Sequence, residues 1–408
     1  MNQEVRPHQA VPLPITACTV VSNCGAGTEA LFKALQAEKT ALKKPALFSV
    51  DFPAFVGEVA ADQLTPVPPS LKAYATRNAR LALAALDHDE DHLRSAIERA
   101  TARYGAKRVG IVLGTSTSGI YETEQAYRAL QAEGQIPENY CFPTQHAWVA
   151  TARFLQEALQ LEGPCYAIST ACSSSSKSIA AAQRLITTGV CDAVIAGGID
   201  SLCRMTLHGF HSLNLVSPAP CTPLDADRSG ISLGEGAGLM LLERPRTVHQ
   251  DCVHLLGAGE SSDAHHMTAP HPEGKGAALA MTHALAQAGL EPHQIDYLNL
   301  HATGTPKNDA SELLGVHAVF GPDIHCSGTK GLTGHTLGAA GGVEAAISWL
   351  ALQQQFLPGT CGLQQLDPAF QGKIVTKNRF DVSVNTVMSN NFGFGGNNAS
   401  LIFGWLHD

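Results

Sequence analysis

Hydrophobic residues along the chain fall into two kinds of segment that follow one another from end to end. Short β-favouring segments, some continuously apolar and some alternating apolar with polar residues, predict strands at 15–21, 108–113, 165–169, 192–198, 239–242, 253–257, 295–300, 324–327, 382–387 and 399–403. Apolar positions three or four residues apart predict helices at 28–36, 70–86, 91–104, 144–160, 277–288 and 337–354, with another from about Asp309. This alternation predicts an α/β protein in which helices connect the strands.

Two stretches interrupt the alternation. Residues 1–14 are polar and rich in proline, which predicts an N-terminal tail, and residues 43–70 hold five prolines, which predicts a long excursion. The strand and helix order runs through once before residue 250 and again after it. Because 408 residues suffice for two domain-sized cores, we expect two halves, residues 15–250 and 251–408.

One cysteine lies at a predicted turn between a strand and a helix. The stretch is Tyr166-Ala-Ile-Ser-Thr-Ala-Cys172-Ser-Ser-Ser-Ser-Lys177, and helical spacing begins after it, with a second strand at 192–198 completing a βαβ unit. The free N–H groups and the positive end of a helix dipole favour an anion, so we expect a lowered pKa for Cys172. On this stretch alone, a buried structural cysteine is an equally good interpretation.

Other reactive side chains also follow directly after predicted strands. His301, and Lys330 with His335, take the same position as Cys172, the edge of an open α/β sheet where ligands bind. A cysteine with two histidines suits acyl transfer, because a thiolate attacks an acyl group and imidazoles stabilise an enolate or oxyanion. Taken singly, each histidine is also explained as a satisfied polar residue at a strand end, and Lys330 as a solvated charge or ion pair.

Two glycine-containing loops are candidates for lining a site. Asn391-Phe-Gly-Phe-Gly-Gly396 offers backbone N–H groups for an oxyanion hole and two phenylalanines for an apolar channel, although a hairpin with packed aromatics fits equally well. Gly114-Thr-Ser-Thr-Ser-Gly119 follows a buried strand but lacks both the Lys-Ser/Thr ending of a P-loop and the GxGxxG spacing. A pocket lining is therefore the better interpretation of the second loop.

Composition excludes several classes of protein. A net charge of −9 without a basic cluster argues against a nucleic-acid partner, and no run of 18 apolar residues predicts a membrane span. The N-terminus has no apolar core of a signal peptide, so we expect a cytoplasmic protein. Eleven cysteines without CxxC pairs predict reduced thiols, and histidine pairs such as His265 and His266 lack further ligands at metal spacing, so no metal site is expected.

Four motifs together carry a family resemblance. Thr170-Ala-Cys172-Ser-Ser-Ser, His301-Ala-Thr-Gly-Thr305, Lys330-Gly-Leu-Thr-Gly-His335 and Asn391-Phe-Gly-Phe-Gly-Gly396 resemble, in order and spacing, the β-ketoacyl-[acyl carrier protein] synthases. The resemblance spans residues 15–405. It implies a thiolase-like fold, a five-layer αβαβα sandwich of two similar halves, usually dimeric, which binds no permanent cofactor and receives substrates on the phosphopantetheine arm of an acyl carrier protein.

The resemblance also implies residue roles. Cys172 would accept an acyl group, with the N–H groups of Cys172 and Phe394 as its oxyanion hole, while His301 and His335 hold a malonyl thioester during loss of CO₂. The supporting assignments are an ion pair of Lys330 with Glu344 that keeps His335 in place, pantetheine contacts from Thr303 and Thr305, a gate at Phe394, and an acyl pocket at Thr115, Ser116, Thr117 and Phe392.

Some positions depart from the family pattern. Asn391 replaces a common Ser, Asn397 a common Thr and Asn308 a frequent Gly, and the 114–119 loop carries hydroxyls in place of glycine and bulky apolar residues. These departures disfavour a long saturated acyl substrate. The pattern is similar to the ketosynthases of bacterial aryl polyene clusters, which gives the hypothesis of an unsaturated aryl acyl chain beside fatty-acid and polyketide alternatives.

Three rival functions also deserve comparison with the residues present. A thiolase needs a second, late cysteine, and Cys326 and Cys361 lie in no convincing motif. A non-catalytic chain-length factor loses the nucleophile, whereas Cys172 is present, so we expect the active member of a homodimer or of a heterodimer with such a factor. A papain-like peptidase would show motifs that are absent.

Overall fold

The computed structural model describes residues 10–246 and 251–406. Strands of the first sheet region run in the order β5-β4-β6-β8-β1, and those of the second in the order β9-β14-β13-β10-β11-β12. A short antiparallel pairing of β1 with β9, at Leu13 with Leu255, joins the two regions. The first region comprises β1 (Leu13–Ser22), β4 (Val109–Gly114), β5 (Cys165–Ile168), β6 (Ala193–Asp200) and β8 (Gly236–Glu243). The second comprises β9 (His254–Ser262), β10 (Tyr297–Asn299), β11 (His325–Ser327), β12 (Lys373–Ile374), β13 (Thr386–Gly393) and β14 (Asn397–Gly404).

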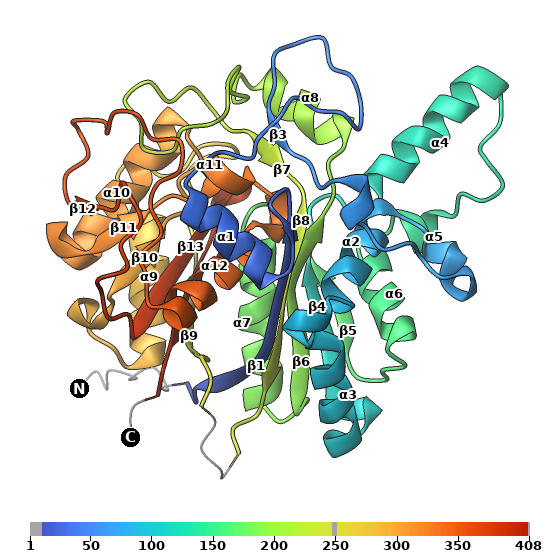
Figure 1. Ribbon diagram of the computed structural model, residues 1–408, viewed down its shortest axis with the longest axis horizontal. Coiled ribbons are helices and arrows are strands. Elements are labelled where there is room, and N and C mark those ends of the chain that lie inside the picture. The colour runs from blue at the N-terminus through green and yellow to red at the C-terminus, as the bar shows by residue number, and fades with distance from the viewer. Residues whose placement is uncertain (1–9, 247–250, 407–408) are drawn as a thin grey trace.

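Helices cover both sheet regions and fill the space between them (Figure 1). Helices α2 (Arg77–Leu86), α3 (Leu93–Tyr104) and α6 (Ala150–Ala158) pack on the outer face of the first region. Helices α7 (Ser174–Thr187) and α12 (Ala340–Gln354) touch each other in the centre, and each contacts strands of the first region, while α12 also contacts β13. Helix α9 (Lys275–Ala288) packs on β9 and β14, and α10 (Pro306–Phe320) packs on α9. The order helix, sheet, helix, sheet, helix is the predicted five-layer sandwich.

Burial accounts for the sequence of the central layer. Helix α12 is apolar on all sides, which is the pattern of a helix buried all round. Helix α12 comes so close to β8 that only glycine fits at the contact, because a Cβ on Gly342 would lie 2.5 Å from the carbonyl oxygen of Gly238. Strands β6 and β8 are buried along their whole length, as expected for strands covered on both faces.

Several local predictions differ from the structure. The expected helix 70–86 is a 3₁₀ segment (Pro69–Tyr74) followed by α2, because Thr76 caps α2 by accepting the N–H of Ala79. The expected helix 144–160 is split into α5 (Phe142–Gln145) and α6. The expected loop 391–396 is the end of β13 followed by a 3₁₀ turn, η8 (Phe394–Gly396), which leads into β14, the partner strand of β13.

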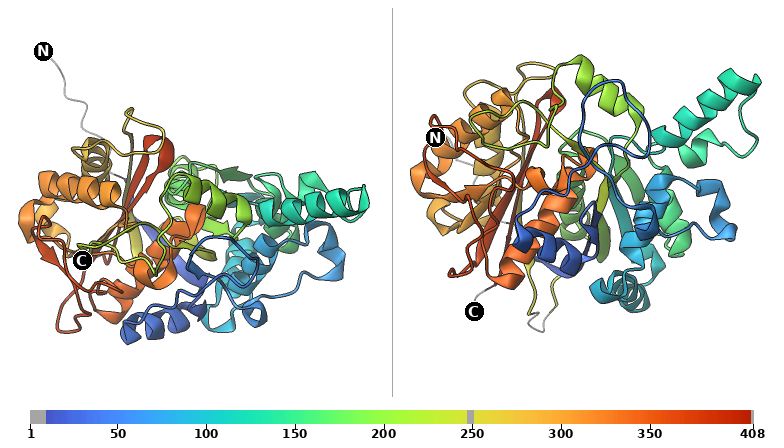
Figure 2. Two further views of the ribbon diagram at one scale, coloured as in Figure 1. Left: turned by 90° about the horizontal axis from the view of Figure 1, so that it is seen from above. Right: turned by 45° about the horizontal axis from the view of Figure 1, so that its top comes forward.

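The described residues form four further α-helices and three further strands of two residues each, besides those of the layers above. These are α1 (Thr28–Ala37), α4 (Ile120–Glu133), α8 (Arg204–Ser212) and the short α11 (Lys330–Thr333), with two-residue strands β2 (Gly25–Ala26), β3 (Val56–Gly57) and β7 (Leu233–Gly234). Helix α4, which the sequence pattern did not reveal, projects from the body of the molecule (Figure 2). Within residues 10–246 and 251–406, no helix has both the length and the apolar character needed to cross a membrane.

Candidate active site

The nucleophile turn connects β5 to α7 and is held by hydrogen bonds within five residues. The N–H of Thr170 donates to Ser174 Oγ at 2.9 Å, and the hydroxyls of Ser174 and Ser173 donate to the carbonyls of Ala171 (2.6 Å) and Thr170 (2.9 Å). Ala171 has φ of +52°, a left-handed conformation that is strained for a residue with a Cβ. The turn therefore places Cys172 before the start of α7, as predicted.

The electrostatics at Cys172 differ from the prediction. Burial raises the pKa of the thiol to about 11, and the Lys330 charge and the N–H groups of Phe394 and Cys172 lower it only in part. The expected lowering of the Cys172 pKa is wrong for the resting protein, because removing water from the thiolate outweighs the effect of Lys330 and the two N–H groups. Cys172 is consequently a thiol at neutral pH.

Two histidines face the thiol from the second half of the chain. His301 follows β10 and His335 follows α11. The centroids of their rings lie 5.3 Å apart, and the ring planes meet at 89°. One ligand atom of each, together with Cys172 Sγ, forms a group whose members all lie within 4.8 Å of one another. Burial and the positive charge of Lys330 hold the pKa of both imidazoles well below the usual value, so both rings are neutral.

Hydrogen bonds at the far side of each ring define its tautomer. The N–H of Leu337 donates to His335 Nδ1 at 3.0 Å, and Lys330 Nζ lies 3.3 Å from His301 Nδ1. Because both Nδ1 atoms accept, the proton of each neutral ring is on Nε2. A metal bound through Nε2 would require the proton on Nδ1, where Leu337 N–H already donates, so this cluster suits an oxyanion better than a cation.

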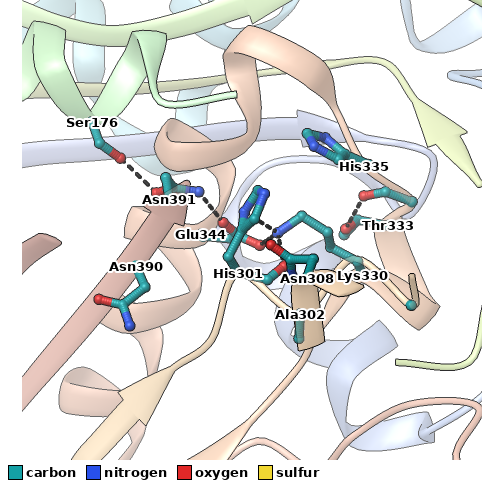
Figure 3. Close-up of polar contacts among 12 residues, drawn as sticks. Ser176, His301, Ala302, Asn308, Lys330, Thr333, His335, Glu344, Asn390 and Asn391 are labelled. Atoms are coloured by element: carbon teal, nitrogen blue, oxygen red, sulfur yellow. Dashed lines mark hydrogen bonds and ion pairs between the residues drawn. The ribbon is translucent and has the colours of Figure 1, made fainter. Parts of the chain in front are cut away.

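A buried ion pair supports His301. Lys330 pairs with Glu344 of α12, and Lys330 Nζ also donates to the His301 carbonyl oxygen at 2.5 Å (Figure 3). The predicted pair is present, but the ammonium contacts His301 rather than His335, whose ring is held by Leu337 instead. The second oxygen of Glu344 accepts the Asn391 amide, and Ser176 of α7 donates to the Asn391 carbonyl oxygen, each at 2.5 Å (Figure 3).

Sequence reasoning missed a second carboxylate beside His301. Glu312 on α10 accepts the N–H groups of His301 and Ala302, both at 2.7 Å. Burial raises its pKa to about 7. The only signal in the sequence is an acidic residue among apolar ones shortly after the His301 motif, which does not distinguish a buried anchor from a solvated charge.

Asp200, at the end of β6, was also missed. Its buried carboxylate accepts the hydroxyls of Thr115 (2.6 Å) and Thr117 (2.7 Å) and the N–H groups of Ser116, Thr117 and Gly338. The Thr115 and Thr117 hydroxyls that the sequence suggested for an acyl pocket thus bind Asp200, and the Ser116 hydroxyl donates to the Ala171 carbonyl at 3.2 Å. Asp200 also connects this loop to the segment that follows His335.

A cavity of about 390 Å³ reaches the three reactive groups. Of the predicted site residues, it is lined by Cys172, His301, His335, Thr303, Thr305, Phe392 and Phe394. The hydroxyls of Thr303 and Thr305 lie 3.0 Å apart, and the ring of Phe392 is 6.1 Å from that of His301. Phe394 packs against Phe210 of α8, with 5.5 Å between the ring centroids. Thr115, Ser116 and Thr117 lie outside this lining.

Comparisons with known proteins agree with this geometry. Residues 63–247 match the β-ketoacyl synthase N-terminal domain, and residues 253–364 match the β-ketoacyl synthase C-terminal domain. The mitochondrial 3-oxoacyl-[acyl-carrier-protein] synthase of Arabidopsis thaliana is 42% identical over 59% of this chain and 56% of that protein. The 3-oxoacyl-[acyl-carrier-protein] synthase 2 of Staphylococcus aureus is 34% identical over 73% of this chain and 77% of that protein.

Solved structures show the same relationship. The ketosynthase ApeO of Xenorhabdus doucetiae, determined in complex with its chain length factor ApeC, matches with a TM-score of 0.89 and 38% identity over the full length of both chains. The ishigamide ketosynthase/chain length factor matches with a TM-score of 0.87 and 26% identity, over 98% of this chain and 100% of that chain. Fold and site thus define a condensing acyltransferase with the thiolase-like fold. The chain belongs to the β-ketoacyl synthase family.

Proposed function

We propose that the chain condenses an acyl group on Cys172 with malonyl-acyl carrier protein. The observation that carries this proposal is the meeting of one thiol with two neutral, Nε2-protonated imidazoles in a single cavity. Cys172 Sγ attacks the acyl thioester carbon, and the pantetheine thiol leaves with the proton. The N–H groups of Cys172 and Phe394 stabilise the oxyanion, and Thr303 and Thr305 contact the pantetheine arm.

The second step uses the histidines. As the malonyl thioester loses CO₂, the electron pair of the broken C–C bond forms an enolate, whose oxygen accepts from His301 and His335. The enolate carbon attacks the acyl thioester on Cys172, the C–S bond to Cys172 breaks, and the departing thiolate takes up a proton from solvent water. The product is a β-ketoacyl thioester that is two carbons longer. Lys330, paired with Glu344, orients His301, while Phe394 and Phe392 line the path of the acyl chain.

Substitutions separate the two steps. Cys172→Ala abolishes condensation, whereas His301→Ala or His335→Ala stops decarboxylation and leaves acylation of Cys172 measurable. Acylation is read by intact-protein mass spectrometry and decarboxylation by release of labelled CO₂ from malonyl carrier protein. Elongation by Cys172→Ala at the wild-type rate would refute the mechanism.

For the acyl chain, an unsaturated aryl substrate is our working hypothesis beside fatty-acid and polyketide chains. It is supported by similarity to ApeO over the whole chain. Purified protein given malonyl carrier protein and a panel of aliphatic and aryl primers reports the preference through its carrier-bound products. Exclusive use of saturated primers would exclude the aryl chain.

A second subunit is part of the proposal. Both structural relatives named above include a chain length factor, and β5, at the end of the first sheet region, is half-buried and pairs on one side, with β4. An open strand edge is a surface for pairing with another chain. We infer a dimer through this edge, either with a second copy or with a chain-length-factor-like protein, in the cytoplasm where we expect the carrier protein. Light scattering of the chain alone and after co-expression with such a factor distinguishes the two dimers.

A further inference from the structure

We propose that Asn391 is a positioning residue that orients Glu344 toward Lys330 and thereby holds His301 for decarboxylation; this inference rests on the proposed function. Asn391 lies in β13, with its side chain fully buried. The residue stands where the resembling family commonly has serine. Its amide connects the nucleophile helix to the ion pair in the order Ser176, Asn391, Glu344, Lys330, His301 (Figure 3).

The direction of the amide follows from its partners. Glu344 is a carboxylate that only accepts, so the NH₂ end of Asn391 must face it, and the carbonyl end must face Ser176. A glycine at position 341 leaves room for this arrangement. A Cβ on Gly341 would lie 2.1 Å from Ser176 Oγ and 2.8 Å from Asn391 Oδ1. A serine at position 391 is too short to reach both partners.

The contact matters because Glu344 is buried. Each of its oxygens has one side-chain partner among the described contacts, Lys330 on Oε1 and Asn391 on Oε2. A buried carboxylate without hydrogen bonds is strongly destabilised in its charged form, so losing the amide favours protonation of Glu344. A neutral Glu344 no longer balances the positive charge of Lys330. The ion pair that holds the ammonium beside His301 Nδ1 is then lost.

Other groups near Glu344 influence its charge as well. Burial raises the pKa of Glu344, while Lys330 from α11 and Asn391 from β13 lower it. Cys172 and Tyr297 lie close enough for the charge of Glu344 to raise the pKa of each. Glu312 is likewise close enough to Lys330 for that ammonium to lower its pKa. Of all these groups, Asn391 is the one whose side chain is neutral, so a change of pH does not remove its hydrogen bond to Glu344.

The test compares three substitutions at one position. Asn391→Ala and Asn391→Ser are expected to slow decarboxylation of malonyl carrier protein by about 10- to 100-fold, as expected for loss of a hydrogen bond to a charged group. Acylation of Cys172 falls by no more than about twofold, because the nucleophile turn is held by its own bonds. In Asn391→Ala the acid limb of the decarboxylation profile moves to higher pH.

Asn391→Asp gives a pH dependence that packing alone would not produce. Two adjacent carboxylates share one proton, which restores a donor to Glu344 at low pH and is lost as the pH rises. Decarboxylation by this variant is therefore expected to fall with rising pH, opposite to Asn391→Ala. Ser176→Ala, which frees the amide carbonyl, is expected to show a smaller loss in the same direction as Asn391→Ala.

The matched control is Asn397→Ala, an amide on the neighbouring strand that accepts from Lys177 Nζ at 3.1 Å and lies outside the cavity lining. Wild-type decarboxylation rates and pH profiles in all three position-391 variants would overturn the inference, as would an equal loss of acylation and decarboxylation in each. Absence of both half-reactions in the wild-type protein would instead refute the proposed function.

Discussion

The two sides of the active site are positioned in different ways. Cys172 is held by a turn whose hydrogen bonds join residues three or four positions apart, from Thr170 to Ser174. The histidine side depends on contacts between distant segments, such as Glu344 with Asn391, 47 positions away. The nucleophile is thus a local feature of the chain, whereas the electrostatics of the histidines belong to the packed interior.

The largest expected effect is on the histidine side. Glu344→Ala leaves the buried Lys330 ammonium without its partner, and removing one member of a buried pair lowers stability by about 3–5 kcal/mol. Urea denaturation of the wild type and the variant measures the loss. Glu273→Ala, in an exposed pair with Lys275, is the control and is expected to change little. A similar small change for Glu344→Ala would show that the pair is not what holds this side together.

The second prediction concerns the protonation of the nucleophile. Because burial raises the pKa of Cys172 to about 11, its thiolate fraction and its rate of alkylation by iodoacetamide should rise by roughly 100-fold from pH 7 to pH 9. Peptide mass spectrometry follows the modification of Cys172 among the eleven cysteines. A rate that levels off near pH 7 would show that the pKa of Cys172 is lowered, as expected from the helix end.

A third prediction uses Glu312. A carboxyl group whose pKa is raised from 4.5 to about 7 in the folded protein stabilises the fold below pH 4.5, and this contribution is lost as the pH rises through about 7. Relative to Glu312→Gln, the wild type should lose more than about 1 kcal/mol of unfolding free energy between pH 5 and pH 8. Denaturant titrations at both pH values test this, with the exposed Glu133→Gln as control. A pH-independent difference would mean that Glu312 stays ionised throughout.

The smallest expected effect is on the nucleophile turn. Ser174→Ala removes the hydroxyl that accepts from Thr170 N–H and donates to Ala171, and should lower stability by about 1 kcal/mol. Decarboxylation should be affected less than acylation, because the histidines have other supports. Thermal denaturation and the two half-reactions measure this. A selective loss of decarboxylation would contradict the separation of the two sides.

Much of the architecture could be predicted from hydrophobic patterning. The strands around Cys172, His301 and Lys330 and the long buried α12 were all expected from the spacing of their apolar residues. The apolar spacing does not reveal helix α4, and it predicts one helix over 70–86 because capping by Thr76 is a local detail that periodicity does not show. The boundary at residue 250 adjoins residues outside the described chain, so the division into 15–250 and 251–408 stays a prediction.

The sequence by itself determined the reactive residues and their family, because the turn around Cys172 and the His301, Lys330 and His335 motifs are short stretches whose chemistry is local. Only the tertiary structure decided how those groups are charged. Burial makes Cys172 a thiol and both histidines neutral, and Asp200, Glu312 and Asn391 supply partners from distant strands and helices. Desolvation and long-range hydrogen bonds depend on what packs around a group, which no local pattern records.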